Sequence, residues 1–574
     1  MESTRGGFSM KTAEQLRTLL ESIDRKSYPA YKSTQGSYDF KDYTLSIDHV
    51  QGDPFAAPSK VSIHLPYQRS GYPVSFLDTP TRQTALEDDL VRQFSQEISR
   101  FHFKAKGSGK SGLINISHPG PEVLSRTACC CTQKEMTVRF QVGFPANGRT
   151  INSRELVKIF FEFLPRCVRN VFFFKNRKPE EVQAVIDLAD DQQFIRNELT
   201  KRKLVSFVAN GAILPRESGV SSRPMKEGSC TAFISPENLQ VTLNLPHHGP
   251  VTGMGVPCGI TLIVGGGYHG KSTLLKALEA GVYNHIAGDG REYVITGHNA
   301  MKLRAEDGRS IRNVDISLFI NDLPNKKDTH CFSTEDASGS TSQAANVIES
   351  IEAGSKVFLI DEDTSATNFM VRDDLMQKVI SRDKEPITPF IERARDLYDK
   401  AGISTVMVAG SSGAYFYIAD TILQMDHYMP FDITRQTREF CAGYGAEPIC
   451  SAPDFALPKE PRKLITRPGS RPDDRLKTKT FGKDTIQVGK EQVDLRFVEQ
   501  LVDSEQTSAL AQMLRYCIEQ QLLKHHSVKE TVGLLLQKIQ KEGLASLDGH
   551  TYAAMGLCLP REQEIFACFN RYRG

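Results

Sequence analysis

The sequence lacks the features that would assign it at once to a membrane, secreted or metal-bound class. No apolar run reaches the roughly 18 residues that a membrane helix needs. The first 20 residues carry the acids Glu2 and Glu14 among their bases, which predicts neither a secretory signal nor a clear transit peptide. None of the 12 cysteines forms a CxxC pair, so we expect reduced thiols rather than zinc or disulfides. The net charge is only +2, so any basic surface must be local.

The chain does have length and two glycine-rich stretches. Its 574 residues suggest about three or four domains. The stretches are KGSGKSG at 106–112 and VGGGYHGKSTLL at 264–275. A phosphate-binding P-loop follows the pattern G-x-x-x-x-G-K-[ST], because its glycines turn backbone N–H groups inward, its lysine reaches the outer phosphates and its hydroxyl ligates Mg²⁺.

The second stretch fits this pattern completely. GITLIV (259–264) is typical of a buried strand, and the residues after the loop have helical spacing. The helix would aim its positive end at the phosphates. The predicted nucleotide-binding residues are Gly265, Gly266, Gly267, Tyr268, His269, Gly270, Lys271, Ser272 and Thr273. Lys271 would also act in catalysis, and Ser272 would ligate the metal.

The first stretch fails the pattern, since Lys104 stands where the leading glycine should be. Two interpretations stay open. The stretch is either a mobile loop without a ligand or a basic loop that contacts single-stranded nucleic acid, with Phe101 and Phe103 stacking on bases. The basic run KNRKP (175–179) fits either a solvated surface or a further nucleic-acid contact. The residues predicted to contact nucleic acid in the two regions are Arg100, Lys104, Lys106, Lys110, Lys175, Arg177 and Lys178.

The segment KVFLIDEDTSATN (356–368) supplies the remaining chemistry of an ATPase. Its VFLI run is typical of a buried parallel strand. Asp361 at the end of that strand would hold Mg²⁺ through water, and Glu362 would orient or polarise the attacking water. An acidic helix cap is the alternative, which the P-loop upstream disfavours.

The segment ASGSTSQ begins a predicted helix and resembles the LSGGQ signature of ABC ATPases. Ser338 precedes Asp361 by 23 residues, as in the ABC order of signature helix followed by strand. In that arrangement the signature residues, here Ser338, Gly339 and Ser340, meet the γ-phosphate held by the P-loop of a second protomer. The resemblance therefore implies two ATP molecules buried in a head-to-tail homodimer.

Three positions depart from the ABC pattern. Ser340 replaces the second glycine of the signature. No glutamine occupies a convincing Q-loop position, so Glu306 or Asp307 is predicted to approach Mg²⁺. Ser411 and Ser412 stand where ABC proteins place a histidine that contacts the γ-phosphate, and we expect these serines to act in catalysis.

Longer stretches resemble one family, the soluble "predicted ATPases of the ABC class". They include HVQGDPFAAPSKV (49–61), RAEDGRSI (304–311), VDISLFINDLP (314–324) and DEDTSATNFMVRD (361–373). More narrowly, the chain resembles the trypanosomatid mitochondrial branch associated with guide-RNA-directed editing of messenger RNA. The resemblance implies ATP and Mg²⁺ as cofactors, a homodimer, binding of single-stranded, guide or messenger RNA, an RNA-editing accessory complex and a mitochondrial location, with no membrane partner.

The expected fold is α/β, with an ABC-type P-loop ATPase core, an α+β N-terminal domain and a small helical C-terminal domain. The predicted boundaries are 1–200 for the N-terminal RNA-binding domain, 201–445 for the ATPase, 446–492 for a basic proline-rich linker and 493–574 for the C-terminal domain. Residues 459–483 hold nine Lys or Arg against three Asp or Glu, which fits either a solvated linker or an arm that follows phosphates.

The leading functional hypothesis is an ATP-hydrolysing homodimer that clamps RNA. One alternative is an RNA-binding assembly factor whose slow ATPase acts as a timer. Another is a DNA-handling ABC ATPase, which the lack of a long coiled-coil insertion between the Walker motifs disfavours. A transporter subunit is disfavoured because we find no segment that would couple to a membrane partner.

Overall fold

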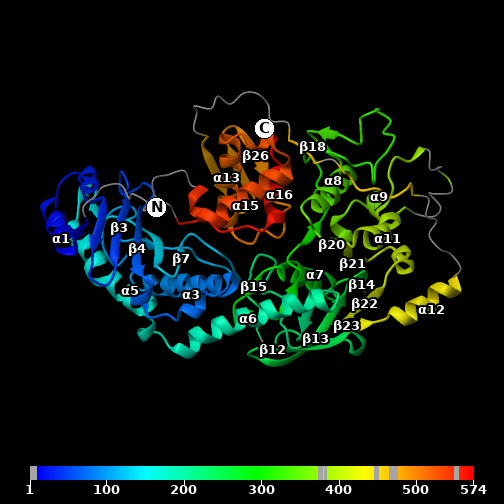
Figure 1. Ribbon diagram of the computed structural model, residues 1–574, viewed down its shortest axis with the longest axis horizontal. Coiled ribbons are helices and arrows are strands. Elements are labelled where there is room, and N and C mark those ends of the chain that lie inside the picture. Colours follow the sequence, from blue (N-terminus) through cyan, green and yellow to red (C-terminus); the bar gives the residue numbers. More distant parts are fainter. Residues whose placement is uncertain are drawn as a thin grey trace. The chain divides into compact units, whose positions relative to one another are not determined.

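The computed structural model describes residues 10–226, 228–372, 379, 384–444, 452–459, 461–464, 476–547 and 555–573. The chain divides into two compact units, whose segments can be followed by colour in Figure 1. The first unit comprises Met1–Asp190 with Glu542–Leu559. The second comprises Asp191–Lys541 with Pro560–Gly574.

The first unit is built on a mostly antiparallel sheet with the strand order β1-β2-β3-β4-β8-β5, in which β7 also pairs with β8. Its longest ladder joins β4 and β8, where Val61 lies opposite Phe140 and Ile63 opposite Val138. These side chains are buried and line one face, because alternate residues of a strand point the same way. The strands are β1 (Lys11–Thr12), β2 (Gly36–Asp39), β3 (Thr44–His49), β4 (Ser59–Pro66), β5 (Ile114–Asn115), β7 (Cys129–Cys131) and β8 (Glu135–Val142).

Helix α3 (Pro80–Ser99) packs on this sheet. It begins where the Thr79 side chain accepts a hydrogen bond from the Arg82 amide, with proline at its first position. Phe94 meets Phe140 of β8 edge to face, with ring centroids 5.5 Å apart. The other principal helices of the N-terminal segment are α1 (Ala13–Ser22), α4 (Ser153–Lys158), α5 (Leu164–Phe172) and α6 (Pro179–Lys201).

The second unit holds a six-stranded sheet in the order β17-β20-β21-β14-β22-β23. The first five strands are parallel, and β23 runs antiparallel to β22. They are β14 (Ile260–Val264), β17 (Ala300–Leu303), β20 (Val357–Asp361), β21 (Ser404–Val408), β22 (Thr421–Asp426) and β23 (Met429–Asp432). The central strands are buried along their length, which explains their continuous apolar sequences.

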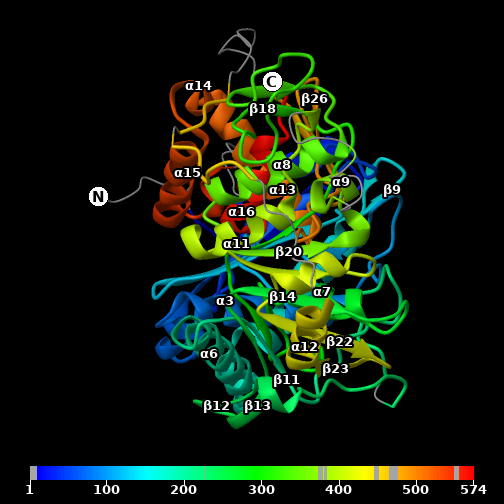
Figure 2. The same cartoon turned by 90° about the vertical axis from the view of Figure 1, so that its right-hand side faces the viewer.

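A second, antiparallel sheet of this unit has the order β12-β13-β11-β16. Its strands are β11 (Leu204–Ala209), β12 (Gln240–Leu245), β13 (Gly249–Pro257) and β16 (Val294–Thr296). Figure 2 shows α7 (Lys271–Ala280), α8 (Gly339–Glu352) and α11 (Phe390–Ala401), which accompany the parallel sheet. The α/β core with an additional N-terminal unit, expected from the sequence, is confirmed.

The C-terminal region contains helices, but it begins with a small sheet. Strands β24 (Thr478–Phe481), β25 (Thr485–Val488) and β26 (Glu491–Asp494) form two successive hairpins. Gly482 and Gly489 each have a φ of +60° at the turns, a conformation that glycine adopts without steric cost. Strands β24 and β25 and the first half of β26 lie within the predicted linker 446–492, where the many lysines obscure a short alternating pattern. Much of the remaining linker lies outside the described residues.

Four helices follow this sheet within the described residues of the C-terminal region. They are α13 (Ser504–Glu519), α14 (Leu522–His525), α15 (Val528–Glu542) and α16 (Glu562–Asn570). Asp503 caps α13 together with Gln506 in a reciprocal capping box. No helix among the described residues is both long and apolar enough to cross a membrane.

Candidate nucleotide site

The glycine-rich loop Gly265–Gly270 joins β14 to α7 (Figure 2). Strand β14 lies between β21 and β22, so the loop stands at the carboxyl edge of the parallel sheet, where α/β proteins bind ligands. Gly270 precedes the helix with a φ of +97° and has no side chain to cap it. The first N–H groups of α7 are therefore left for an external acceptor.

The glycines of this loop serve two different needs. A Cβ atom on Gly265 would lie 2.3 Å from the Met425 carbonyl oxygen, and one on Gly270 would lie 3.1 Å from the Tyr428 ring. A Cβ atom on Gly267 would meet nothing within 4 Å. The outer glycines thus permit close packing within the fold, whereas the middle of the loop leaves its backbone open to a ligand.

Lys271 crosses the loop. Its Nζ atom donates hydrogen bonds to the carbonyl oxygens of Gly265, at 2.7 Å, and Gly266, at 2.8 Å. Ser272 is exposed and Thr273 half-buried in the first turn of α7. The ammonium group, the helix N-terminus and the two hydroxyls form a donor set that suits a polyphosphate.

The two acidic residues predicted to serve hydrolysis lie at the end of β20. Asp361 is the last residue of the strand and is buried, and its side chain accepts a hydrogen bond from the Asp363 amide. Glu362 accepts hydrogen bonds from the Gly410 amide at 2.5 Å and the Ser411 amide at 3.0 Å. The Ser411 hydroxyl donates a third at 2.5 Å. The loop after β21 therefore fixes the orientation of this carboxylate.

These contacts keep Glu362 ionised. Partial burial alone would raise the pKa of Glu362, but the Ser411 hydroxyl, the two amides and the charge of Lys271 together lower it below its ordinary value. Of the two predicted serines, Ser411 is the one that contacts the carboxylate. Ser412 precedes the short helix Gly413–Tyr417 without capping it through its side chain.

Glu306 and Asp307, which were predicted to take the place of the Q-loop glutamine, have different surroundings. Glu306 is buried, pairs with Arg571 and accepts a hydrogen bond from Asn346. Because its carboxylate is already engaged inside the fold, Glu306 does not suit the predicted role of metal ligand. Asp307 is exposed, and its Oδ1 atom lies 3.2 Å from the place that a Cβ atom on Gly339 would take. The accessible carboxylate of this segment therefore stands beside the signature helix.

The signature segment has an open helix end. Ser338 is the N-cap of α8 but makes no side-chain cap. Its exposed hydroxyl shares hydrogen bonds with Thr341 at 2.9 Å and with Ser340 at 3.5 Å. Hydroxyls and N–H groups thus face outward at the N-terminus of a 14-residue helix, an arrangement that suits an anion.

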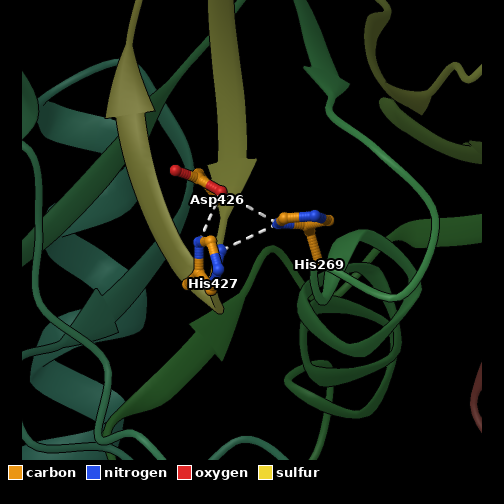
Figure 3. Close-up of side chains that lie close together, drawn as sticks. All are labelled: His269, Asp426 and His427. Carbon is orange, nitrogen blue, oxygen red and sulfur yellow. Dashed lines mark hydrogen bonds and ion pairs between the residues drawn. The ribbon is translucent and has the colours of Figure 1, made fainter.

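Three side chains connect the glycine loop to the turn between β22 and β23 (Figure 3). Asp426 Oδ1 lies 3.0 Å from His269 Nδ1 and 2.7 Å from His427 Nδ1. These residues offer ligand atoms within 4.8 Å of one another, as a metal site requires. However, His269 Nδ1 also accepts the His427 amide at 2.9 Å, so a metal at that nitrogen would have to displace this bond. The three residues are better placed to hold the glycine loop against the turn between β22 and β23 than to bind a metal ion.

A cavity of about 450 Å³ lies beside the glycine loop, within the size range of small-molecule sites. Its lining includes Leu214, Met225, Phe233, Thr273, Met425 and Tyr428. An apolar pocket next to a phosphate cradle suits the flat ring of a nucleotide base. No sequence pattern predicts this pocket, because its residues come from three distant segments and carry no motif.

The other glycine-rich stretch, 106–112, belongs to the first unit and has no open cradle. A Cβ atom on Gly109 would lie 2.5 Å from the Pro54 carbonyl oxygen, and one on Gly112 would lie 2.0 Å from that of Ala105. The Ser108 amide donates to Ala146 at 2.7 Å, and the Lys110 amide to Pro54 at 2.9 Å. The loop is thus packed against two neighbouring segments.

The predicted nucleic-acid contacts differ in their availability. Lys104 and Lys106 are exposed and Lys110 half-buried, and Lys104 lies over the Phe101 ring at 5.1 Å. Lys175 is exposed too. Arg100 pairs with Glu97 at 2.6 Å and Lys178 with Glu181 at 2.6 Å, both at the surface. Arg177 is different: it forms a buried pair with Asp89 at 2.9 Å, so its guanidinium serves the interior of the unit and is not available to RNA.

Together, the strand order, the glycine loop and the acidic pair at the end of β20 define a P-loop ATPase domain. Residues 178–454 match the ABC_ATPase family, described as a P-loop domain. Residues 13–175 match ABC_N, the N-terminal domain of ATPases of the ABC class, and residues 477–574 match the MRB1590 C-terminal domain. The chain belongs to the ATPases of the ABC class and is similar to the MRB1590 branch at its C-terminal end.

Single relatives match less of the chain. It is 31% identical to the uncharacterized protein MJ1628 of Methanocaldococcus jannaschii over 229 residues, 39% of this chain and 50% of that protein. The chain thus spans about half the length of this curated relative. A crystal structure of the ADP conformation of MJ1267, an ATP-binding cassette of an ABC transporter, is 12% identical, with a TM-score of 0.25, over 42% of this chain and 95% of that one.

Proposed function

We propose that this protein binds and hydrolyses ATP with Mg²⁺ between two head-to-tail copies of its chain, and that its first unit binds RNA. The observation that carries the ATPase proposal is that one protomer has two complementary exposed surfaces. The glycine loop offers a donor set for a triphosphate, and the N-terminus of α8 is exposed with its hydroxyls facing outward. A second copy would bring these two surfaces together.

The roles of the residues follow from their positions. Lys271 and the N–H groups of α7 would bind the outer phosphates, and the cavity beside the loop would hold the base. Ser272 and Asp361 would hold Mg²⁺, which supplies charge neutralisation at the phosphates when bound. Glu362, ionised and fixed by Ser411, would orient the attacking water. Ser338 and the α8 N-terminus of the partner would stabilise negative charge on the terminal phosphate.

RNA binding rests on the surface around the 106–112 stretch. The hydrogen bonds of Lys110 and Ser108 hold this stretch against the loop that carries Phe55 and against the segment that precedes Arg149. Phe55 and Phe103 are 62% and 46% exposed, and the Arg149 side chain is 81% exposed. Exposed rings among cations suit stacking of bases and neutralisation of phosphates in a single strand.

The similarity of the C-terminal residues to the MRB1590 domain supports guide or messenger RNA as the ligand, a role in mitochondrial RNA editing and an accessory complex of that process as the partner.

The test of the ATPase proposal is Glu362→Gln. This change removes the hydrolytic carboxylate while keeping a side chain that accepts hydrogen bonds. We expect hydrolysis to fall by at least about 10²-fold, and ATP with Mg²⁺ to convert the protein to a stable dimer in light scattering. Glu392→Gln, on the distant helix α11, is the control and should behave as the parent. A Glu362→Gln protein that stays monomeric at saturating ATP would contradict the shared site.

A further inference from the structure

The segment Arg304–Arg309 connects three parts of the second unit. The Ala305 amide donates to the Thr364 carbonyl at 3.0 Å, just beyond the acidic pair of β20. The Gly308 amide donates to Ala337 at 2.9 Å, immediately before the signature serine. Between these two hydrogen bonds, the Glu306 side chain points into a buried polar network. Arg571 of the C-terminal segment contacts Glu306 in this network.

Glu306 holds the first turns of α8. Its amide donates to the Ser342 hydroxyl at 2.9 Å, and that hydroxyl donates to the Gly339 carbonyl at 2.9 Å. Its Oε1 atom accepts the Asn346 side-chain amide at 3.0 Å, and the same amide also reaches the Arg304 carbonyl at 2.9 Å. Moving Glu306 would therefore move the helix end that presents Ser338 and Gly339.

Glu306 is in turn held by Arg571, from the C-terminal segment that matches the MRB1590 domain. The guanidinium approaches both carboxylate oxygens, with Nε 3.1 Å from Oε2 and Nη2 on Oε1. A third guanidinium nitrogen donates to the Ala567 carbonyl at 2.8 Å, which fixes the side chain to α16. The Arg571 and Glu306 side chains are only 6% and 5% exposed. A bidentate pair of this kind constrains direction as well as distance.

Buried charge makes the pair sensitive to the loss of either member. The charge of Arg571, with that of Arg309 and the hydrogen bonds, overcomes burial and lowers the pKa of Glu306. Removing one partner would strand the other charge in the interior, whereas replacing both by neutral groups is often tolerated. This difference allows a positioning role to be separated from a stabilising one.

We propose that Arg571 is a positioning residue for ATP hydrolysis: acting through Glu306, it aligns the N-terminus of α8 and so makes hydrolysis depend on the C-terminal segment. The inference rests on the proposed function, because α8 acts there on the terminal phosphate. It adds a way for the C-terminal region, through movement of α16, to control turnover without touching the nucleotide.

The experiment compares Arg571→Met with the neutral pair Glu306→Gln/Arg571→Met in the full-length chain. We expect both to lower kcat by roughly 10- to 100-fold, since misplacing groups around a reacting centre by about 1 Å costs on that order. Binding of ATP to the monomer should stay within about 2-fold of the parent, because the glycine loop is unchanged. The single variant should lose Tm, and the double variant should recover it.

Arg561 provides the matched control. It forms an equally buried pair with Glu564 at the start of the same helix, with side chains 2% and 0% exposed, and it also contacts the carbonyls of His298 and Ala300. The pair Arg561→Met/Glu564→Gln should leave kcat near that of the parent.

The outcomes separate the two proposals. Recovery of kcat together with Tm in the Glu306→Gln/Arg571→Met protein would overturn the positioning role and leave a stabilising one. Absence of hydrolysis in the parent, or an unchanged kcat in Ser338→Ala, would instead contradict the proposed function itself.

Discussion

The two glycine-rich stretches contain similar residues for opposite reasons. In 106–112, the glycines let backbone segments approach one another closely, as Gly109 does against Pro54. In 265–270, the outer glycines do the same, but Gly267 faces open space. A glycine that fills a crowded position stabilises the fold, whereas one in an open position leaves room for another molecule. The surroundings of the missing Cβ atom separate a structural loop from a binding loop, and composition alone does not.

The lysines of the two stretches provide the strongest test of this difference. Lys271→Ala should lower kcat/KM for ATP by roughly 10²- to 10³-fold, because a charged donor to the phosphates is lost. Lys110→Ala should leave hydrolysis unchanged, since its backbone amide makes the contact with Pro54. Steady-state phosphate release measures both. Equal losses in the two variants would contradict the distinction.

Substitution of the glycines should show the reverse pattern for stability. Gly109→Ala should destabilise the first unit by about 2–5 kcal/mol, because a Cβ atom at a φ of +62° is strained and meets the Pro54 carbonyl. Gly267→Ala should cost less than about 1 kcal/mol but weaken ATP binding. Thermal unfolding and nucleotide titration measure the two effects. A Gly109→Ala protein as stable as the parent would show that the loop adjusts freely.

The two units also differ in how a buried carboxylate makes stability depend on pH. Burial raises the pKa of Glu87 in α3 to about 7, against hydrogen bonds from Cys131 and Gln83 that lower it. The folded state therefore keeps this proton up to about pH 7, while the unfolded chain releases it near its ordinary pKa. The unfolding free energy should fall between about pH 4.5 and 7 and then level off, by on the order of 3 kcal/mol. Glu87→Gln should remove that fall and stabilise the protein at pH 8.

Glu279 is the counterpart in the second unit. Burial also raises the pKa of Glu279 to about 7, but its carboxylate lies 3.0 Å from the buried ammonium group of Lys302. Glu279→Gln should lower the unfolding temperature at pH 8, because it leaves Lys302 without its counter-charge. Thermal melts at pH 8 should show opposite shifts in the two variants, and shifts of the same sign would contradict this explanation. At pH 5.5, where both carboxyls carry a proton, both shifts should be small.

The smallest expected effect is on RNA. Replacing Lys104, Lys106 and Lys110 together with glutamine should weaken binding of a single-stranded RNA about 10-fold and reduce the slope of log K against log salt by up to about 2. Lys356→Gln with Lys400→Gln, in the second unit, controls for the removal of two of these three charges. Fluorescence anisotropy over a salt series measures the slope. An unchanged slope would leave the 106–112 stretch with a purely structural role.

The sequence predicted local features well and distant ones poorly. The strand, loop and helix around Lys271 are contiguous, so pattern and spacing were enough to find them. Glu362 was found from its strand, but its contact with Ser411, 49 residues away, required the pairing of β20 with β21. The partner of Glu306 lies 265 residues along the chain, and no periodicity signals such a pair. The sequence predicted Arg177 as an RNA contact because it stands in a basic run typical of a surface. Its side chain instead points inward and pairs with Asp89.

The serine beside Glu362 has a consequence for where such an enzyme can work. A histidine in that place would gain or lose a proton across the range of pH found in cells, and its charge would change with it. A hydroxyl has no such transition, and the carboxylate that it holds already ionises more readily than a free one. In the proposed enzyme, Glu362 and Ser411 should therefore keep the same charge through metabolic swings in acidity.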